Sequence, residues 1–201
     1  MTITYVVETG LYVNVTNRCT NRCDFCIRKN GDGAYGSDSL WLEREPTKEE
    51  IFDAIRSAGA ENYREIVFCG YGEPTCRLDD VLWVCGQIRA TYPSILIRLN
   101  TNGHASLIHG ADVASRFAGC FDTVSISLNA PSAEGYDEIC HSRYGLAAFD
   151  GMLAFAKAVK PYVPCVMFSV VRQFLSPQAL EECRQLCNDL GISLKVREYI
   201  S

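Results

Sequence analysis

The chain has 201 residues, of which 48% are apolar, enough to bury roughly 70% of the unfolded surface as one domain, residues 1–201. Its net charge is -5 and no Lys/Arg cluster is longer than Arg28-Lys29, so a nucleic-acid partner is not indicated. No apolar run approaches the ~20 residues of a membrane span and the N-terminus lacks a signal-peptide pattern, so neither membrane insertion nor secretion is expected.

Six short β-rich runs follow one another along the chain. They lie at 11–15, 65–70, 95–103, 122–130, 164–172 and 193–199. Strands that alternate with helical patterns imply a parallel sheet. A strand-helix-strand step takes about 30 residues, and a closed eight-unit barrel typically needs about 250. The expected fold is therefore α/β, an incomplete (β/α)6 TIM-like open barrel with parallel strands.

Helical patterns fill the intervals between these runs. The first begins with Thr47 three residues ahead of Glu50, which is a capping-box pattern. The last is bounded by Ser176-Pro177 and by Gly191, typical start and stop residues. The remaining helical segments are expected at 78–88, 104–118, 132–141 and 147–160.

The expected strands place apolar and polar side chains on opposite faces. In the fourth run, Val124 and Ile126 fall on one face, and Ser125, Ser127 and Asn129 fall on the other. Parallel strands covered by helices are apolar on both faces unless one face lines a cavity. The polar face therefore indicates a wet lumen that holds a ligand. The alternative is that these groups satisfy one another in a layered barrel core.

Three cysteines, Cys19, Cys23 and Cys26, lie on a polar loop of residues 16–30 after the first expected strand. Barrel enzymes carry their sites on such loops, at the carboxyl ends of the strands. The chain has 11 cysteines, an odd number, which favours a reducing cytoplasm with free thiols. Because the loop follows the first strand, it lies where barrel enzymes carry their catalytic residues.

The spacing leaves more than one metal group open. A structural zinc site needs four protein ligands, and here the fourth would be Cys69 or Cys76. A ferredoxin-type cluster normally uses four cysteines, so three thiolates on a four-iron cluster leave one iron for another ligand. The second interpretation is favoured, with a substrate or cofactor on the open iron.

A glycine-rich turn, CGYGEPT, follows the second expected strand. Its glycines let the backbone approach a ligand closely, Glu73 offers an acceptor for an ammonium group, and Pro74 fixes the turn. Such turns are common in α/β proteins, so this one indicates a ligand site only in combination with the cysteine loop.

Together, these motifs resemble those of the radical S-adenosylmethionine (SAM) superfamily. Its signature has three cysteines at this spacing, with an aromatic residue, here Phe25, before the last. Its glycine-glycine-glutamate-proline turn is present with Tyr71 in place of the first glycine. Residues 99–103 and 127–131 are similar to its third- and fourth-strand motifs, and Arg143 falls where many members carry an arginine near the SAM carboxylate. The chain looks most like the small radical SAM proteins associated with TatD-family hydrolases.

The resemblance implies an oxygen-sensitive enzyme in which Cys19, Cys23 and Cys26 hold three irons of one [4Fe-4S] cluster and SAM chelates the fourth. It implies reductive cleavage of SAM to methionine and a 5'-deoxyadenosyl radical, which abstracts hydrogen from an unidentified substrate. The electron would come from a low-potential donor of the flavodoxin or ferredoxin type.

The same resemblance implies a set of cofactor-binding residues. Glu73 and the backbone at Gly72 would hold the methionine ammonium group, and Ser127 and Asn129 would bond the ribose or carboxylate. The full expected set is Phe25, Gly72, Glu73, Asn100, Asn102, Ser127, Asn129 and Arg143.

Several interpretations remain open beside this one. A glycyl-radical activase or a carboxydeazaguanine-synthase-like enzyme would share all of these motifs, and a non-enzymatic iron-sulfur electron carrier or sensor would share the cysteines. Cys183 and Cys187 are expected to be core thiols, and no auxiliary-cluster domain is expected.

Two possible roles also remain open for each of two pairs of basic side chains. His104 and His109 either reach substrate or are solvated. Arg98 and Arg197 either bind a substrate anion in the lumen or pair with carboxylates such as Glu198.

Overall fold

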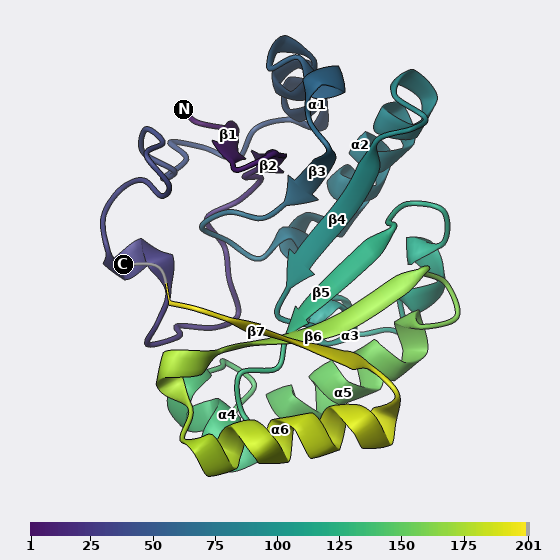
Figure 1. Ribbon diagram of the computed structural model, residues 1–201. Helices are drawn as coiled ribbons and strands as arrows, with labels where there is room; N and C mark the ends of the chain where they lie inside the picture. The colour runs from purple at the N-terminus through teal and green to yellow at the C-terminus, as the bar shows by residue number, and fades with distance from the viewer. Residues whose placement is uncertain (200–201) are drawn as a thin grey trace.

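Strands from both halves of the chain form one sheet in the order β1 to β7 in the computed structural model, which describes residues 1–199 (Figure 1). They are β1 (Thr4–Val7), β2 (Gly10–Val13), β3 (Glu65–Phe68), β4 (Leu96–Thr101), β5 (Thr123–Ser127), β6 (Cys165–Val171) and β7 (Ser193–Arg197). Strands β2 to β7 are parallel, and β1 pairs antiparallel with β2. β1 and β7 stay at the two edges, so the barrel is open, as the sequence predicted.

The helices lie on the outer side of the curved sheet (Figure 1). They are α1 (Lys48–Ser57), α2 (Leu78–Thr91), α3 (Ala105–His109), α4 (Ala133–Cys140), α5 (Ala147–Val159) and α6 (Pro177–Leu190). Between them and the sheet lies one apolar core, in which Leu99, Ile126 and Phe168 are fully buried. Burial of such side chains contributes about 1.5 to 3 kcal/mol each.

The inner face of the sheet is polar, as expected from the alternation. Asn100 on β4 pairs in register with Ser125 on β5, and one row further on, Ser127 pairs with Ser169 on β6. Paired residues of parallel strands point to the same face. The hydroxyl and amide groups therefore line the concave side of the barrel, above which the carboxyl ends of the strands carry their loops.

The local signals at the helix ends are confirmed. Thr47 accepts from the Glu50 N–H at 3.2 Å while the Glu50 carboxylate accepts from the Thr47 N–H at 2.8 Å, a complete capping box. Ser176 caps α6 with Pro177 in its first turn, and Gly191 ends it in a left-handed conformation. Within residues 1–199, each helix is too short or too polar to cross a lipid bilayer.

Some boundaries differ from the prediction. The helix expected over 104–118 is only the five-residue α3 followed by a 3-10 turn at Ala114–Phe117, because Gly110 turns left-handed with φ of 63° and breaks the helical run. The strand expected over 95–103 ends at Thr101, before Gly103 with φ of 79°. The antiparallel strand β1 was not predicted.

Candidate active site

The cysteine loop lies at the carboxyl edge of the sheet and is fastened to the end of α4. The Arg22 N–H donates to the Cys140 carbonyl at 2.9 Å, and the Asp24 N–H donates to the Ile139 carbonyl at 3.0 Å. The Arg143 N–H donates back to the Thr20 carbonyl at 2.9 Å. The first two bonds use carbonyls that the last turn of α4 leaves free. They hold the loop at a fixed place above the lumen.

The three thiols of the loop are half-buried, and two of them have nitrogen donors beside them. The Asn21 N–H donates to Cys19 Sγ at 3.4 Å, and Arg28 Nε donates to Cys26 Sγ at 3.3 Å. Burial and the negative charge of Glu73 raise the pKa of the Cys19 thiol to about 12, while the Asn21 N–H acts in the opposite direction. A positive partner ion would reverse this preference and hold the thiolate form.

A chain of buried hydrogen bonds supports the loop from below. Asn21 Nδ2 donates to Tyr136 Oη at 2.9 Å, and Tyr136 Oη lies 3.3 Å from His104 Nε2. His104 Nδ1 lies 2.9 Å from Thr20 Oγ1, which also accepts from Asn102 Nδ2 at 2.8 Å. We refer to this chain of five residues as the polar layer. Because each bond is buried, losing one partner would leave another polar group unsatisfied.

His104 departs from both sequence expectations. It is fully buried inside the polar layer, neither solvated nor free to reach a substrate. Burial lowers its pKa to about 4, so the ring is neutral at pH 7 and bridges Thr20 and Tyr136. Its position next to a strand end in the sequence gave no sign of this tertiary role.

Glu73 joins the turn after β3 to the end of β4. Its Oε1 accepts from Thr75 N, Thr75 Oγ1 and Thr101 Oγ1 at 2.7 to 3.0 Å, and its Oε2 accepts from the Asn102 N–H at 2.7 Å. Burial raises the pKa of this carboxyl, and the four donors oppose that shift. A carboxylate offers about four acceptor positions, two on each oxygen. The Oε2 atom therefore retains room for one further donor, the place where the expected ammonium contact would fit.

Gly72 is required by close approach of the chain to itself. A Cβ at this position would lie 2.2 Å from the Thr16 carbonyl oxygen and 2.6 Å from that of Arg18. The neighbouring Glu73 N–H donates to the same Arg18 carbonyl at 2.7 Å. The turn after β3 is thus packed directly on the start of the cysteine loop, which the sequence did not reveal.

The other expected site residues fall into two groups. Asn102 lies beside the loop, with Nδ2 3.9 Å from Cys19 Sγ. Asn129, with φ of 60° and 3% exposed, has an Oδ1 atom without a hydrogen-bond partner among the described residues. Ser127 is half-buried on the inner face. Asn129 Nδ2 also donates to Cys140 Sγ at 3.4 Å, so Asn102 and Asn129 lie next to the loop and to its anchor on α4.

The remaining expected residues have partners elsewhere. Asn100 bonds the Cys69 thiol within the lumen. Phe25 stacks against Phe174 with ring centres 5.2 Å apart, so it anchors the loop to the segment after β6. The exposed guanidinium of Arg143 lies 4.8 Å from the centre of the neighbouring Tyr144 ring.

The donor set fits an iron-sulfur cluster better than a single ion. Within residues 1–199, no three His, Cys, Asp or Glu side chains converge on one point as a single ion such as zinc would need. A cluster takes each thiolate on a different iron, and N–H groups directed at the sulfurs are usual there. The loop offers both features, with Asn129 Oδ1 as an orphaned acceptor close by.

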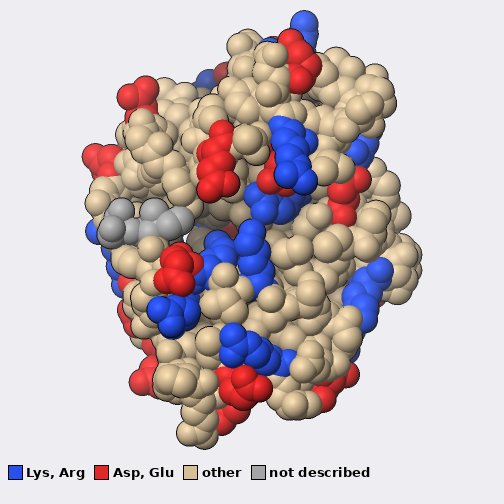
Figure 2. All heavy atoms as spheres, viewed as in Figure 1, with Lys and Arg blue, Asp and Glu red and all other residues tan. Residues whose placement is uncertain are grey.

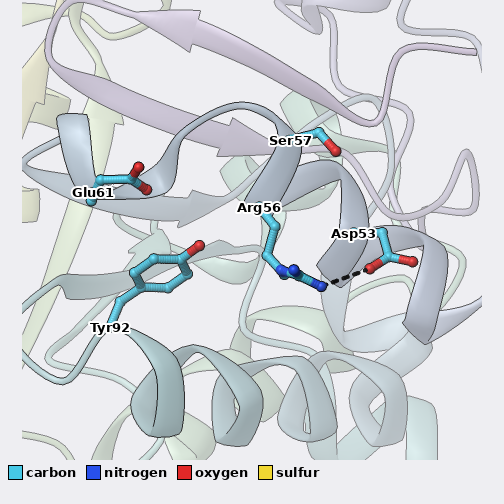
Figure 3. A pocket seen from close by; sticks show the side chains of 5 residues that line it. All are labelled: Asp53, Arg56, Ser57, Glu61 and Tyr92. Carbon is cyan, nitrogen blue, oxygen red and sulfur yellow. Dashed lines mark ion pairs between the residues drawn. The ribbon is translucent and has the colours of Figure 1, made fainter.

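A separate pocket of about 580 Å³ lies at the ends of α1 and α2, far from this loop along the strands (Figure 3). Arg56 pairs with Asp53 at 3.6 Å on one side of it, and Tyr92 and Glu61 face it from the other side. It sits at the amino edge of the sheet and contains no cysteine. Barrel enzymes do not place their chemistry there.

Comparison with known proteins places these features in context. The family model described as Radical SAM superfamily matches residues 13–189. The chain is 27% identical over 192 residues to a probable GTP 3',8-cyclase of Thermococcus kodakarensis, covering 94% of this chain and 56% of that protein. It is 28% identical over 161 residues to molybdenum cofactor biosynthesis protein 1 of Drosophila melanogaster, covering 80% of this chain and 27% of that protein.

Solved structures show the same fold. SuiB of Streptococcus suis bound to S-adenosylmethionine matches with a TM-score of 0.66 at 18% identity, over 94% of this chain and 38% of that one. Methylornithine synthase (PylB) matches with a TM-score of 0.64 at 10% identity, over 95% of this chain and 53% of that one. The chain spans less than two thirds of the length of each of these proteins.

Proposed function

The chain belongs to the radical SAM superfamily, whose enzymes use SAM and an iron-sulfur cluster, and from this membership we propose that it holds one [4Fe-4S] cluster through Cys19, Cys23 and Cys26. The chemistry supplied there is reductive cleavage of SAM to methionine and a 5'-deoxyadenosyl radical, followed by hydrogen abstraction from a substrate. Residues 1–201 act in this proposal as one domain with a single cluster.

The observation that carries the proposal is the rigid presentation of three half-buried thiols above a polar lumen. The loop is pinned by three backbone bonds to the end of α4 and to Arg143. It is braced from below by the polar layer, and N–H donors at Cys19 and Cys26 stabilise negative sulfur. An electron carrier needs the thiols but has no use for a polar lumen or for a carboxylate turn beneath the loop.

The chain's own residues would then orient SAM. Glu73 Oε2 has room for one donor from the methionine ammonium group beside the Gly72 backbone. Asn129 Oδ1, buried without a hydrogen-bond partner within residues 1–199, is suited to accept from a ribose hydroxyl, and Ser127 lies in the same wall. Asn102 holds the loop at Cys19 and so fixes the distance between these groups.

Three further residues and an electron donor also belong to the proposal. Asn100 faces the lumen one row below Asn102, and Arg143 offers a positive charge near the SAM carboxylate. Phe25 acts through packing, since its ring rests on Phe174. A flavodoxin- or ferredoxin-like protein is the proposed electron donor. The reaction on the substrate, including activase and ring-contraction chemistry, is decided by groups in the lumen.

The test is anaerobic reconstitution followed by reduction in the presence of SAM. We expect about four irons per chain and slow formation of 5'-deoxyadenosine without substrate. Replacement of Cys19, Cys23 or Cys26 by Ala should remove both. Cys120→Ala is the matched control, because Cys120 is half-buried far from the loop and its thiol donates to the Arg116 carbonyl. Full iron content without 5'-deoxyadenosine would defeat the proposal in favour of an electron carrier.

A further inference from the structure

The inner face of the barrel carries basic side chains from two separate strands. Arg98 on β4 is in register with Thr123 on β5. Lys195 and Arg197 on β7 are in register with Ser169 and Val171 on β6, so they share the inner face. Figure 2 shows Lys and Arg side chains gathered in the middle of this face beside a hollow, with Asp and Glu side chains also near its rim.

The charges of these side chains are not balanced. Arg98 pairs with Glu65 at 2.9 Å and donates to Tyr12 Oη at 3.1 Å. Lys195 and Arg197 have no carboxylate within ion-pair distance among the described residues. The adjacent Glu198 is instead bound by Arg172 at 3.1 Å and by Gln173. Within residues 1–199, the two positive charges at the mouth of the lumen therefore have no partner carboxylate.

The positive charge of Arg197 acts on groups of the opposite wall of the barrel. Burial raises the pKa of the Cys69 thiol, and the positive charges of Arg197 and then Arg98 act in the opposite direction. The charge of Arg197 also acts against the burial that raises the pKa of Tyr35. Cys69 follows β3 and Tyr35 lies on the segment before α1, both on the side opposite β7. Cations from β4 and β7 thus influence the same part of the lumen.

We propose that the lumen binds a phosphate group of the substrate between Lys195 and Arg197, with Arg98 deeper in the barrel. A phosphate monoester carries about 1.5 to 2 negative charges at pH 7, which matches two unpaired cations, whereas a carboxylate carries one. Arginine binds such oxygens in a fork and lysine acts as a point charge. This inference rests on the proposed function for the meaning of the lumen as a substrate site.

Inorganic phosphate is the probe, titrated into the protein at constant ionic strength and followed by phosphorus NMR linewidth. The double variant Lys195→Gln/Arg197→Gln should weaken binding at least tenfold. The matched control Lys157→Gln/Arg64→Gln removes the same charge from exposed positions outside the lumen and should change binding less than twofold. Arg197→Lys, which keeps the cation, should retain most of the binding. Circular dichroism checks that each variant is folded.

Several outcomes would overturn the inference. They are undetectable binding to wild type, equal binding to wild type and the double variant, and acetate binding as tightly as phosphate. The titration needs neither cluster nor SAM, so its result is independent of the 5'-deoxyadenosine assay. One combination of results would reject only the proposed function and keep the anion site. In it, the wild-type protein does not cleave SAM, and the double variant loses the phosphate binding that wild type shows.

Discussion

Two buried regions of the molecule are held together by different forces. Under the cysteine loop, the polar layer and Glu73 form a connected set of hydrogen bonds. On the outer side, Phe117 packs edge to face on Phe155 and at a tilt on Phe121, among aliphatic side chains. An apolar core tolerates small changes gradually, whereas a buried network loses much when one member goes. The first region fixes positions, and the second supplies most of the stability.

The largest effect on the free energy of unfolding is expected for Glu73→Ala. Removing the carboxylate leaves the N–H groups of Thr75 and Asn102 buried without an acceptor, at about 1 to 3 kcal/mol each. We expect a loss of about 4 kcal/mol in urea unfolding of the apoprotein. The control Glu138→Ala, at an exposed position on α4, should change stability by less than about 0.5 kcal/mol. Equal stability of both variants would mean that Glu73 serves only as a cofactor contact.

The second prediction is a pH dependence arising from the polar layer. The pKa of His104 is about 4 in the folded protein, below its unfolded value of about 6.5. The unfolded chain therefore takes up the proton first as the pH falls, and about 3 kcal/mol of stability should be lost between pH 7 and pH 4. Unfolding measured across this range should show a shallower fall in His104→Gln than in wild type.

His109→Gln is the control for that measurement. His109 is exposed and lies 2.9 Å from the Thr75 carbonyl, outside the polar layer. Its variant should keep the wild-type pH profile. A profile flattened equally by both substitutions would show that the polar layer is not the source.

The apolar side is tested by Cys183→Ala together with Cys187→Ala. Both thiols are buried between α6 and the sheet. Losing their volume should lower stability by about 2 kcal/mol, while iron content after reconstitution stays at the wild-type level. A fall in iron would mean that these cysteines were wrongly assigned to the core.

The smallest change in stability is expected at the loop itself. Cys26→Ser alters a half-buried group whose backbone stays pinned, so the apoprotein should unfold within about 1 kcal/mol of wild type. Iron binding should nevertheless be lost, as measured by iron analysis and visible absorbance. A large destabilisation would show that the thiol has a packing role. The region under the cysteine loop would then contribute to stability through packing, as the apolar core does.

The contrast also explains what the sequence could predict. Periodicity and caps are local, so the strands, the capping box at Thr47 and the end of α6 at Gly191 were predicted. The position of the cysteine loop followed from the order of strands. The contact of Gly72 with Thr16 and the burial of His104 depend on segments that are far apart in the sequence. No local sequence pattern predicts such contacts.

Two features were predicted wrongly for local reasons: the strand β1 and the length of the helix after β4. β1 has only four residues, and its pairing partner is the next strand along, across a turn at Glu8 with φ of 52°. The residues after β4 have a helical pattern, but the helix ends at Gly110, which takes a left-handed conformation. Phe25 was matched to a motif, but its contact with Phe174 depends on where β6 ends.

The fastening of the loop to the end of α4 also bears on how the protein is made. The loop leaves the ribosome early, yet His141, which lies 3.1 Å from Asp24, comes 117 positions later. At about 5 to 20 residues per second, the thiols wait on the order of ten seconds before their anchors exist. During that interval they belong to an unfolded chain, free to react or to bind other metals. Cluster delivery is therefore best suited to a stage after translation has passed the fourth helix.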